Sequence, residues 1–238
     1  MKGRFQPLRW LTQLSHYLPG RCLLCDCPFD DGAALFCSAC LDDLPVNDCA
    51  CYQCALPLAT PGYCAACLDQ PPSFDKTVAP FRYQAPLATL INRWKHQGDS
   101  RPLNTLIDSL RNQLLQEYQQ TDWPDLLLPV PLPWRRRLVR GFNQTEQMSK
   151  LLSRHLNIPS NHQLLRAKGG EHSQQGLNRK QRLGNLAGRF TLREKVTAEH
   201  VALVDDVMTT GATASYLAKL LQDAGVKRVD VWLIARTP

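Results

Sequence analysis

Four Cys-x-x-Cys pairs lie within one short stretch of this 238-residue chain, and they restrict its fold more than any other feature. All ten cysteines fall between positions 22 and 67. One such turn presents two thiolates, and two turns complete a tetrahedral Cys₄ zinc site. Eight cysteines form two similar units: Cys22, Cys25, Cys37 and Cys40, then Cys51, Cys54, Cys64 and Cys67. We therefore predict two structural Zn²⁺ ions in an internal repeat over residues 21–70.

Other uses of paired cysteines fit this sequence less well. Disulfides need an oxidising compartment, and the first 20 residues lack the apolar segment and cleavage site of a secretory signal. A thioredoxin-like site needs one Cys-x-x-Cys beside a βαβ unit, not four in a row. Consecutive ligand pairing within each unit is the simplest assignment, but interleaved pairing stays open. Cys27 and Cys49 are either small buried residues or alternative ligands.

Composition indicates a globular protein. Hydrophobic residues make up 44% of the chain and charged residues 21%, which is typical of folded domains. No stretch approaches the ~18–20 apolar residues of a membrane span. We expect a cytoplasmic protein without membrane insertion and a helical segment over residues 1–20; the sequence predicts no oligomeric state.

The net charge of +7 is unevenly distributed. Residues 121–190 hold twelve Lys and Arg against four Asp and Glu, whereas residues 22–67 hold no Lys or Arg and six Asp. Each Cys₄ zinc site adds about −2, so the cysteine-rich part should repel nucleic acid and suits a structural or protein-docking role. The basic part is suited to polyanions, with a solvated basic face or a nucleic-acid patch as alternatives.

Hydrophobic periodicity beyond residue 74 predicts alternating strands and helices. Strands are expected over residues 77–83, 125–131, 201–207 and 228–236, and helices over 86–98, 102–119, 143–156 and 214–225. This order predicts an α/β domain over residues 74–238 with a mostly parallel sheet. Residues 74–120 are the candidate for a separate hood above the site.

Residues 201–213, VALVDDVMTTGAT, carry the most chemical information. A strand ends in Asp205 and Asp206, a Thr/Gly turn follows, and then a helix begins. Its free N–H groups and dipole suit a phosphate, and Gly211 permits a turn with positive φ. Acids at the carboxyl end of a strand can accept hydrogen bonds from sugar hydroxyls. An ordinary strand before a capped helix is the alternative, but it needs no paired acids.

This segment resembles the phosphoribosyl pyrophosphate (PRPP) loop of type I phosphoribosyltransferases. It is not a Walker P-loop, because it has no GxxxxGK[ST]. Two other basic segments suit phosphate oxygens: the loop after residue 131, with its arginine forks, and the Gly-rich residues 166–189. A segment of that second kind is typically a mobile functional loop or disordered.

The combination of motifs is more specific than its parts. The paired cysteine units, RGFNQ (140–144), QQGLNRKQRLGNLAGRF (174–190) and VDDVMTTGAT together resemble the ComF family of competence-related, phosphoribosyltransferase-like proteins. The resemblance covers about residues 20–238. It implies a double zinc ribbon fused to a type I phosphoribosyltransferase fold, and a link to the use of external DNA and to nucleotide salvage.

The resemblance also implies roles for particular residues. Asp205 and Asp206 would be catalytic and hold the ribose hydroxyls. The loop that would cradle the 5′-phosphate comprises Val207, Met208, Thr209, Thr210, Gly211, Ala212 and Thr213. Candidates for pyrophosphate and for the closing loop are Arg135, Arg136, Arg137, Arg140, Arg179, Lys180 and Arg182. Mg²⁺ would bridge pyrophosphate and ribose oxygens.

The acceptor of a transfer reaction is not predicted by any motif. Two functions therefore stay open. One is an active phosphoribosyltransferase. The other is a non-catalytic PRPP sensor, or an adaptor that binds single-stranded DNA or DNA-uptake proteins.

Overall fold

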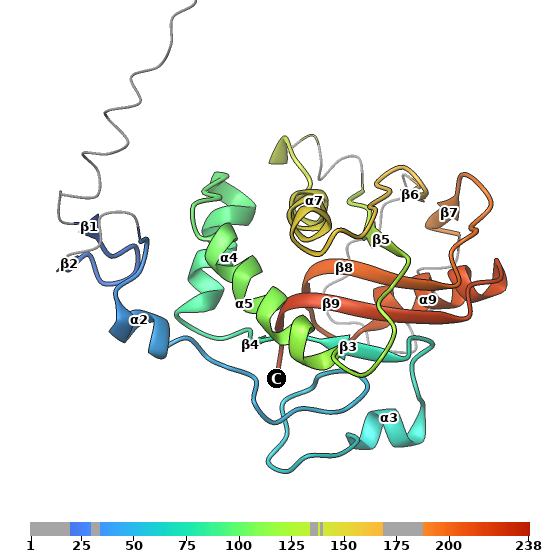
Figure 1. Ribbon diagram of the computed structural model, residues 1–238, viewed down its shortest axis with the longest axis horizontal. Helices are drawn as coiled ribbons and strands as arrows, with labels where there is room; N and C mark the ends of the chain where they lie inside the picture. The colour runs from blue at the N-terminus through green and yellow to red at the C-terminus, as the bar shows by residue number, and fades with distance from the viewer. Residues whose placement is uncertain (1–19, 30–33, 134–137, 139, 169–187) are drawn as a thin grey trace, which may run out of the picture.

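A parallel β-sheet forms the centre of the protein in the computed structural model, which describes residues 20–29, 34–133, 138, 140–168 and 188–238 (Figure 1). The strand order is β3 (Lys76–Val78), β9 (Arg228–Arg236), β8 (His200–Met208) and β5 (Leu126–Pro129), and β4 (Phe81–Arg82) also pairs with β9. Every pairing within it is parallel. The predicted α/β class with a mostly parallel sheet is confirmed, although the strand expected over 77–83 is split in two around Pro80.

Helices cover both faces of this sheet. One face carries α4 (Leu87–Gln97), α5 (Leu103–Glu117) and α7 (Gln144–Leu156), and the other carries α9 (Ala212–Asp223) (Figure 1). The bounds of the helices follow local signals. Gly98, with φ of 72°, ends α4, and the Asn143 side chain accepts a hydrogen bond from the Thr145 N–H at the start of α7.

Alternation of side chains along β8 separates two hydrophobic cores. Val201 and Leu203 pack on the side of α9, whereas Ala202 and Val204 pack on the side of α5 and α7. Because successive side chains of a strand point to opposite faces, the adjacent acids that follow also diverge. The second acid of the pair should therefore turn toward the face that α4 covers.

The two cysteine units occupy different places. The first contains β1 (Gly20–Arg21), β2 (Pro28–Phe29) and α2 (Ser38–Asp42), and the second contains α3 (Ala65–Asp69). Figure 1 shows the first unit at one end of the molecule, beyond α4, and α3 below the sheet. Cys22 and Phe36 of the first unit pack against Leu90 of α4 in a small cluster. The second unit contributes to the main core beside α9.

The residues that connect the second unit to the sheet are docked rather than free. The Ser73 N–H donates to Ser215 Oγ over 3.0 Å, and Gln222 Nε2 donates to the Ser73 carbonyl over 2.7 Å. The expected hood is also partly integrated, since β3 and β4 belong to the central sheet. Only α4 and α5 remain of that range as elements outside the sheet.

The polar segment expected over residues 166–189 begins and ends in a small antiparallel sheet. Its strands are β6 (Leu165–Ala167) and β7 (Phe190–Leu192). Residues 169–187 between them lie outside the described residues, as does most of the helical segment expected over 1–20. Within the ranges described above, no helix is long and apolar enough to cross a membrane.

Candidate functional site

The acid pair lies at the carboxyl half of β8. Asp206 is buried, and its Oδ1 lies 2.8 Å from Nζ of Lys95, near the end of α4. Both side chains of this ion pair are more than four-fifths buried. Asp205 lies on the other face and accepts the Asp206 backbone N–H over 2.9 Å. Sequence reasoning missed Lys95, which has no motif of its own and meets the acids only through the packing of α4.

The two carboxyls have different environments. Burial, together with the charge of Asp206, raises the pKa of Asp205 from 3.8 to about 7. Its carboxyl therefore changes charge near neutral pH, whereas Asp206 has a lysine ammonium as its partner. Carboxyl groups with a perturbed pKa, such as Asp205, are common at functional sites.

The raised pKa of Asp205 predicts how stability depends on pH. A folded-state pKa above the unfolded value favours folding while the group is protonated, so this contribution is lost as pH rises from about 4 through about 7. We expect Asp205→Asn to remove that loss, and the variant should gain stability relative to wild type between about pH 5 and about pH 8. Urea unfolding at both pH values measures the difference. The exposed Asp223 provides the control, and an equal pH response of wild type and Asp205→Asn would contradict the prediction.

The loop between β8 and α9 presents polar groups. Thr209 and Thr210 are exposed. Gly211, with φ of 74°, is the N-cap of α9 and has no side chain to cap it, while Thr210 Oγ1 accepts a long hydrogen bond from the Ala212 N–H (3.4 Å). The first N–H groups of a helix have no acceptor within it and therefore suit an anion. A Cβ at Gly211 would lie only 3.3 Å from Met208 Sδ, so a glycine also allows Met208 to pack closely against this turn.

Other residues of the predicted loop face inward. Met208 is buried, and its carbonyl accepts hydrogen bonds from the Thr237 N–H (3.0 Å) and from Nη1 of Arg236 (3.2 Å). Val207 packs against the core on the side of α4 and α5. These two residues support the loop with their side chains, while Thr209, Thr210, Gly211 and Thr213 form its accessible part.

The predicted basic residues are only partly placed. Arg140 Nη1 donates to Oε1 of Gln144, the first residue of α7, over 3.3 Å. Gln144 is itself buried, and its Nε2 has no partner among the described residues. The remaining candidates lie outside the described residues: Arg135, Arg136, Arg137, Arg179, Lys180 and Arg182.

The eight paired cysteines form two clusters with the geometry of metal sites. Within each cluster all four Sγ atoms lie within 4.8 Å of one another, and the grouping is consecutive rather than interleaved. A Zn–S bond of about 2.3 Å implies S–S separations of about 3.8 Å in a tetrahedron. The distances from Cys25 Sγ to Cys37 Sγ (3.8 Å) and from Cys54 Sγ to Cys64 Sγ (3.6 Å) fit this. Cys27 and Cys49 lie outside both clusters and in no disulfide.

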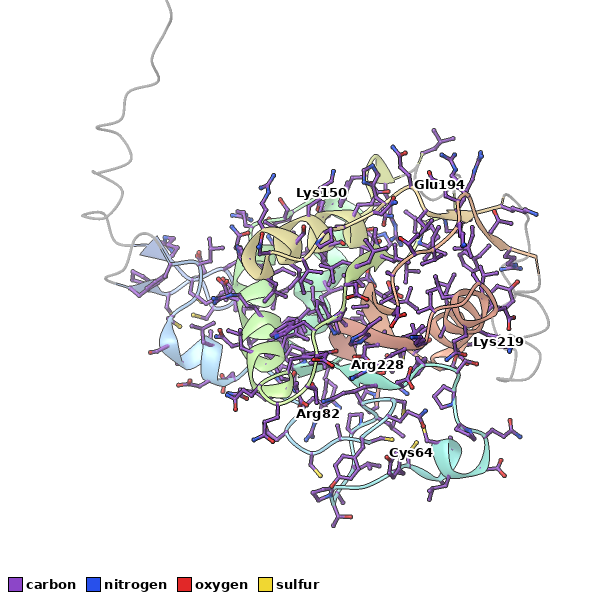
Figure 2. The ribbon with its side chains drawn as sticks, turned by 45° about the vertical axis from the view of Figure 1, so that its right-hand side comes forward. Cys64, Arg82, Lys150, Glu194, Lys219 and Arg228 are labelled. Atoms are coloured by element: carbon purple, nitrogen blue, oxygen red, sulfur yellow. The ribbon has the colours of Figure 1, made fainter. Side chains whose placement is uncertain are left out.

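The two clusters differ in burial. All four cysteines of the second are buried, whereas the first is partly exposed (Figure 2, where Cys64 labels the second). Although burial would raise it, backbone N–H donors lower the pKa of Cys22 to about 6 and that of Cys51 to about 7. These hydrogen bonds favour the thiolate, the form that binds zinc, at the first cysteine of each unit.

The two cysteine tetrads agree with a match to a family model. Residues 14–68 match the family model described as a double zinc ribbon domain. Competence protein F of Haemophilus influenzae is 38% identical over 173 residues, covering 70% of this chain and 75% of that protein. DNA utilization protein YhgH of Escherichia coli K12 is 34% identical over 223 residues, covering 92% and 98%. A crystal structure of adenine phosphoribosyltransferase matches at 13% identity with a TM-score of 0.37, over 57% of this chain and 69% of that one.

Two consecutive Cys₄ clusters attached to a parallel α/β sheet define a double-zinc-ribbon α/β protein, the class expected from the sequence. The matches to competence protein F and YhgH exceed 30% identity and cover most of both chains, which is enough to assign a family. The chain belongs to the ComF family.

Proposed function

We propose that this protein binds PRPP with Mg²⁺ at the loop between β8 and α9. The observation that carries the proposal is the joint position of Asp205, Asp206 and the α9 N-terminus, whose N-cap residue is a glycine, at the carboxyl edge of one sheet. This edge is where open α/β sheets bind ligands. The helix N-terminus would hold the 5′-phosphate, and the carboxylates would accept hydrogen bonds from the ribose hydroxyls.

The chemistry of the site also fits the metal. Mg²⁺ prefers carboxylate and phosphate oxygens, and the site offers two carboxylates next to the place proposed for PRPP. When bound, the ion would neutralise charge on the pyrophosphate group. Oδ1 of Asp206 already contacts Nζ of Lys95. A ribose hydroxyl would therefore either displace Lys95 from Asp206 or share the carboxylate with it.

The names of the relatives suggest the biological setting. Competence protein F and DNA utilization protein YhgH indicate a role in the uptake or use of external DNA, and a PRPP site would connect that role to nucleotide salvage. The arginines that would carry direct DNA binding, Arg135, Arg136 and Arg137, lie outside the described residues.

Calorimetric titration with PRPP and Mg²⁺ tests the pocket. We expect the wild type to bind and the double variant Asp205→Asn/Asp206→Asn to bind about 100-fold more weakly, since each carboxylate loses charge-assisted hydrogen bonds. Asp223→Asn on α9 is the matched control, because Asp223 pairs with Lys219 on the exposed side of that helix. Absence of wild-type binding, or equal affinities, would refute the proposal. Pyrophosphate release with a panel of nitrogen acceptors then separates a transferase from a sensor.

A further inference from the structure

The second cysteine tetrad is built into the support of the β8–α9 loop, and the first is not. Cys54 and Cys64 of the second belong to the same core cluster as Met208 and Ala212 of the loop. The first tetrad packs instead in a small cluster with Leu90 of α4. The two centres, similar in sequence, therefore have different mechanical connections to the site.

Arg236 is the first connection between the second tetrad and the loop. It is the last residue of β9 and only 6% exposed. Its Nε donates to the Cys54 carbonyl over 3.0 Å, and its Nη1 donates to the Met208 carbonyl over 3.2 Å. One rigid guanidinium thus joins a residue of the second tetrad to the residue where the loop begins.

The charge of Arg236 needs a partner that the carboxylates do not supply. Among the ion pairs of the described residues, none includes Arg236. A Cys₄ zinc centre carries about −2. An unpaired charge in this position would be costly, so the loaded second centre is the natural counter-charge.

Phe74 provides a second, independent connection. Gln53 lies between Cys51 and Cys54 in the same turn, and its Nε2 donates to the Phe74 carbonyl over 2.9 Å. The Phe74 ring lies 3.7 Å from the position that a Cβ on Gly211 would occupy. The ring is 1% exposed and therefore cannot shift independently of its surroundings.

We propose that zinc in the second tetrad holds the β8–α9 loop in its binding conformation, through Arg236 and Phe74, while zinc in the first tetrad does not. Arg236 acts as a positioning residue and not as a ligand contact. The proposal rests on the proposed function only in taking this loop as the ligand site. The proposal states that the order of the β8–α9 loop depends on zinc in the second tetrad and not on zinc in the first.

Hydrogen exchange of the full-length protein with two zinc ions, measured on peptides that cover residues 207–214, tests this without PRPP. In Arg236→Gln we expect loop exchange to accelerate about tenfold, because the hydrogen bonds from a charged group to the Cys54 and Met208 carbonyls are lost. A chelator should also remove one of the two zinc ions faster than from wild type. Arg236→Lys keeps the charge but not the planar fork, so it should retain zinc while the loop still exchanges faster.

Two controls separate this effect from general destabilisation. Arg228→Gln disturbs the opposite end of β9, where Arg228 pairs with Asp230, and should leave loop exchange within about twofold of wild type. Cys40→Ser removes a ligand of the first tetrad and should also leave loop exchange within about twofold of wild type. Loop exchange and zinc release unchanged in Arg236→Gln, or loop exchange accelerated equally in Cys40→Ser, would overturn the proposal. Hydrogen exchange and zinc release are measured without PRPP, so they test this proposal alone. The calorimetric titration tests PRPP binding separately.

Discussion

Replacement of Asp230 by alanine is expected to lower the free energy of unfolding by about 3–5 kcal/mol, the cost of removing one partner of a buried ion pair. Asp230 lies on β9 with no exposed surface. Its carboxylate accepts hydrogen bonds from Tyr118 Oη, from His200 Nε2 over 2.9 Å and from Arg228 Nη2 over 3.0 Å. Although burial would raise it, these donors hold the pKa of Asp230 below its usual value. Alanine would leave them without an acceptor, and urea unfolding measures the loss.

Asp205→Asn is the comparison that makes this prediction specific. It changes a carboxyl on the neighbouring strand β8, nearer the carboxyl edge of the sheet, because Asp230 pairs with Ala202 and Asp205 with Leu233. The ionised form of Asp205 is disfavoured, since its pKa is raised. At about pH 8 we expect Asp205→Asn to be neutral or stabilising and Asp230→Asn to be destabilising. Equal losses of stability in the two Asn variants would contradict the assignment of Asp230 as a structural acid and of Asp205 as a ligand-binding acid.

Local signals explain why much of the fold was predictable. Apolar residues at helical spacing and a glycine at position 98 define α4, and an N-cap asparagine opens α7. β8 and β9 contain nearly continuous apolar runs, because a central parallel strand is buried on both faces. Cys-x-x-Cys spacing predicted the two tetrads because both ligands of each turn are close in sequence.

The contacts that sequence reasoning missed join segments far apart in the chain. Lys95 reaches Asp206 only because α4 crosses the carboxyl edge of the sheet, and Arg236 reaches Cys54 because the second ribbon packs beneath β9. Neither lysine nor arginine carries a spacing signal for such a partner. The break between β3 and β4 at Pro80 also depends on tertiary context, since the Pro80 carbonyl accepts the Asn47 N–H from the segment between the ribbons.

The two tetrads have the same sequence pattern but different packing, so we expect unequal losses of stability when a zinc ligand is removed from each. Cys64→Ser should lower the melting temperature far more than Cys37→Ser. All four cysteines of the second tetrad are buried within the main core, whereas Cys37 is half-buried in a small cluster at one end of the molecule. Binding of structural zinc is worth about 10–16 kcal/mol in small domains, which is comparable to the whole stability of a protein.

We therefore expect Cys64→Ser to lose one zinc and to unfold the α/β domain at a temperature at least about 15 °C below wild type, on a scale of about 2–4 °C for each kcal/mol lost. Cys37→Ser should also lose one zinc, but the main transition should move by less than about 5 °C, because the first ribbon meets the domain through few side chains, at Leu90 of α4 and through its own Leu24. Thermal unfolding followed by circular dichroism, with zinc counted by mass spectrometry, measures both effects. Cys49→Ser is the control outside the tetrads and should retain two zinc ions. Equal shifts for Cys64→Ser and Cys37→Ser would show that the two ribbons contribute alike, contrary to their packing.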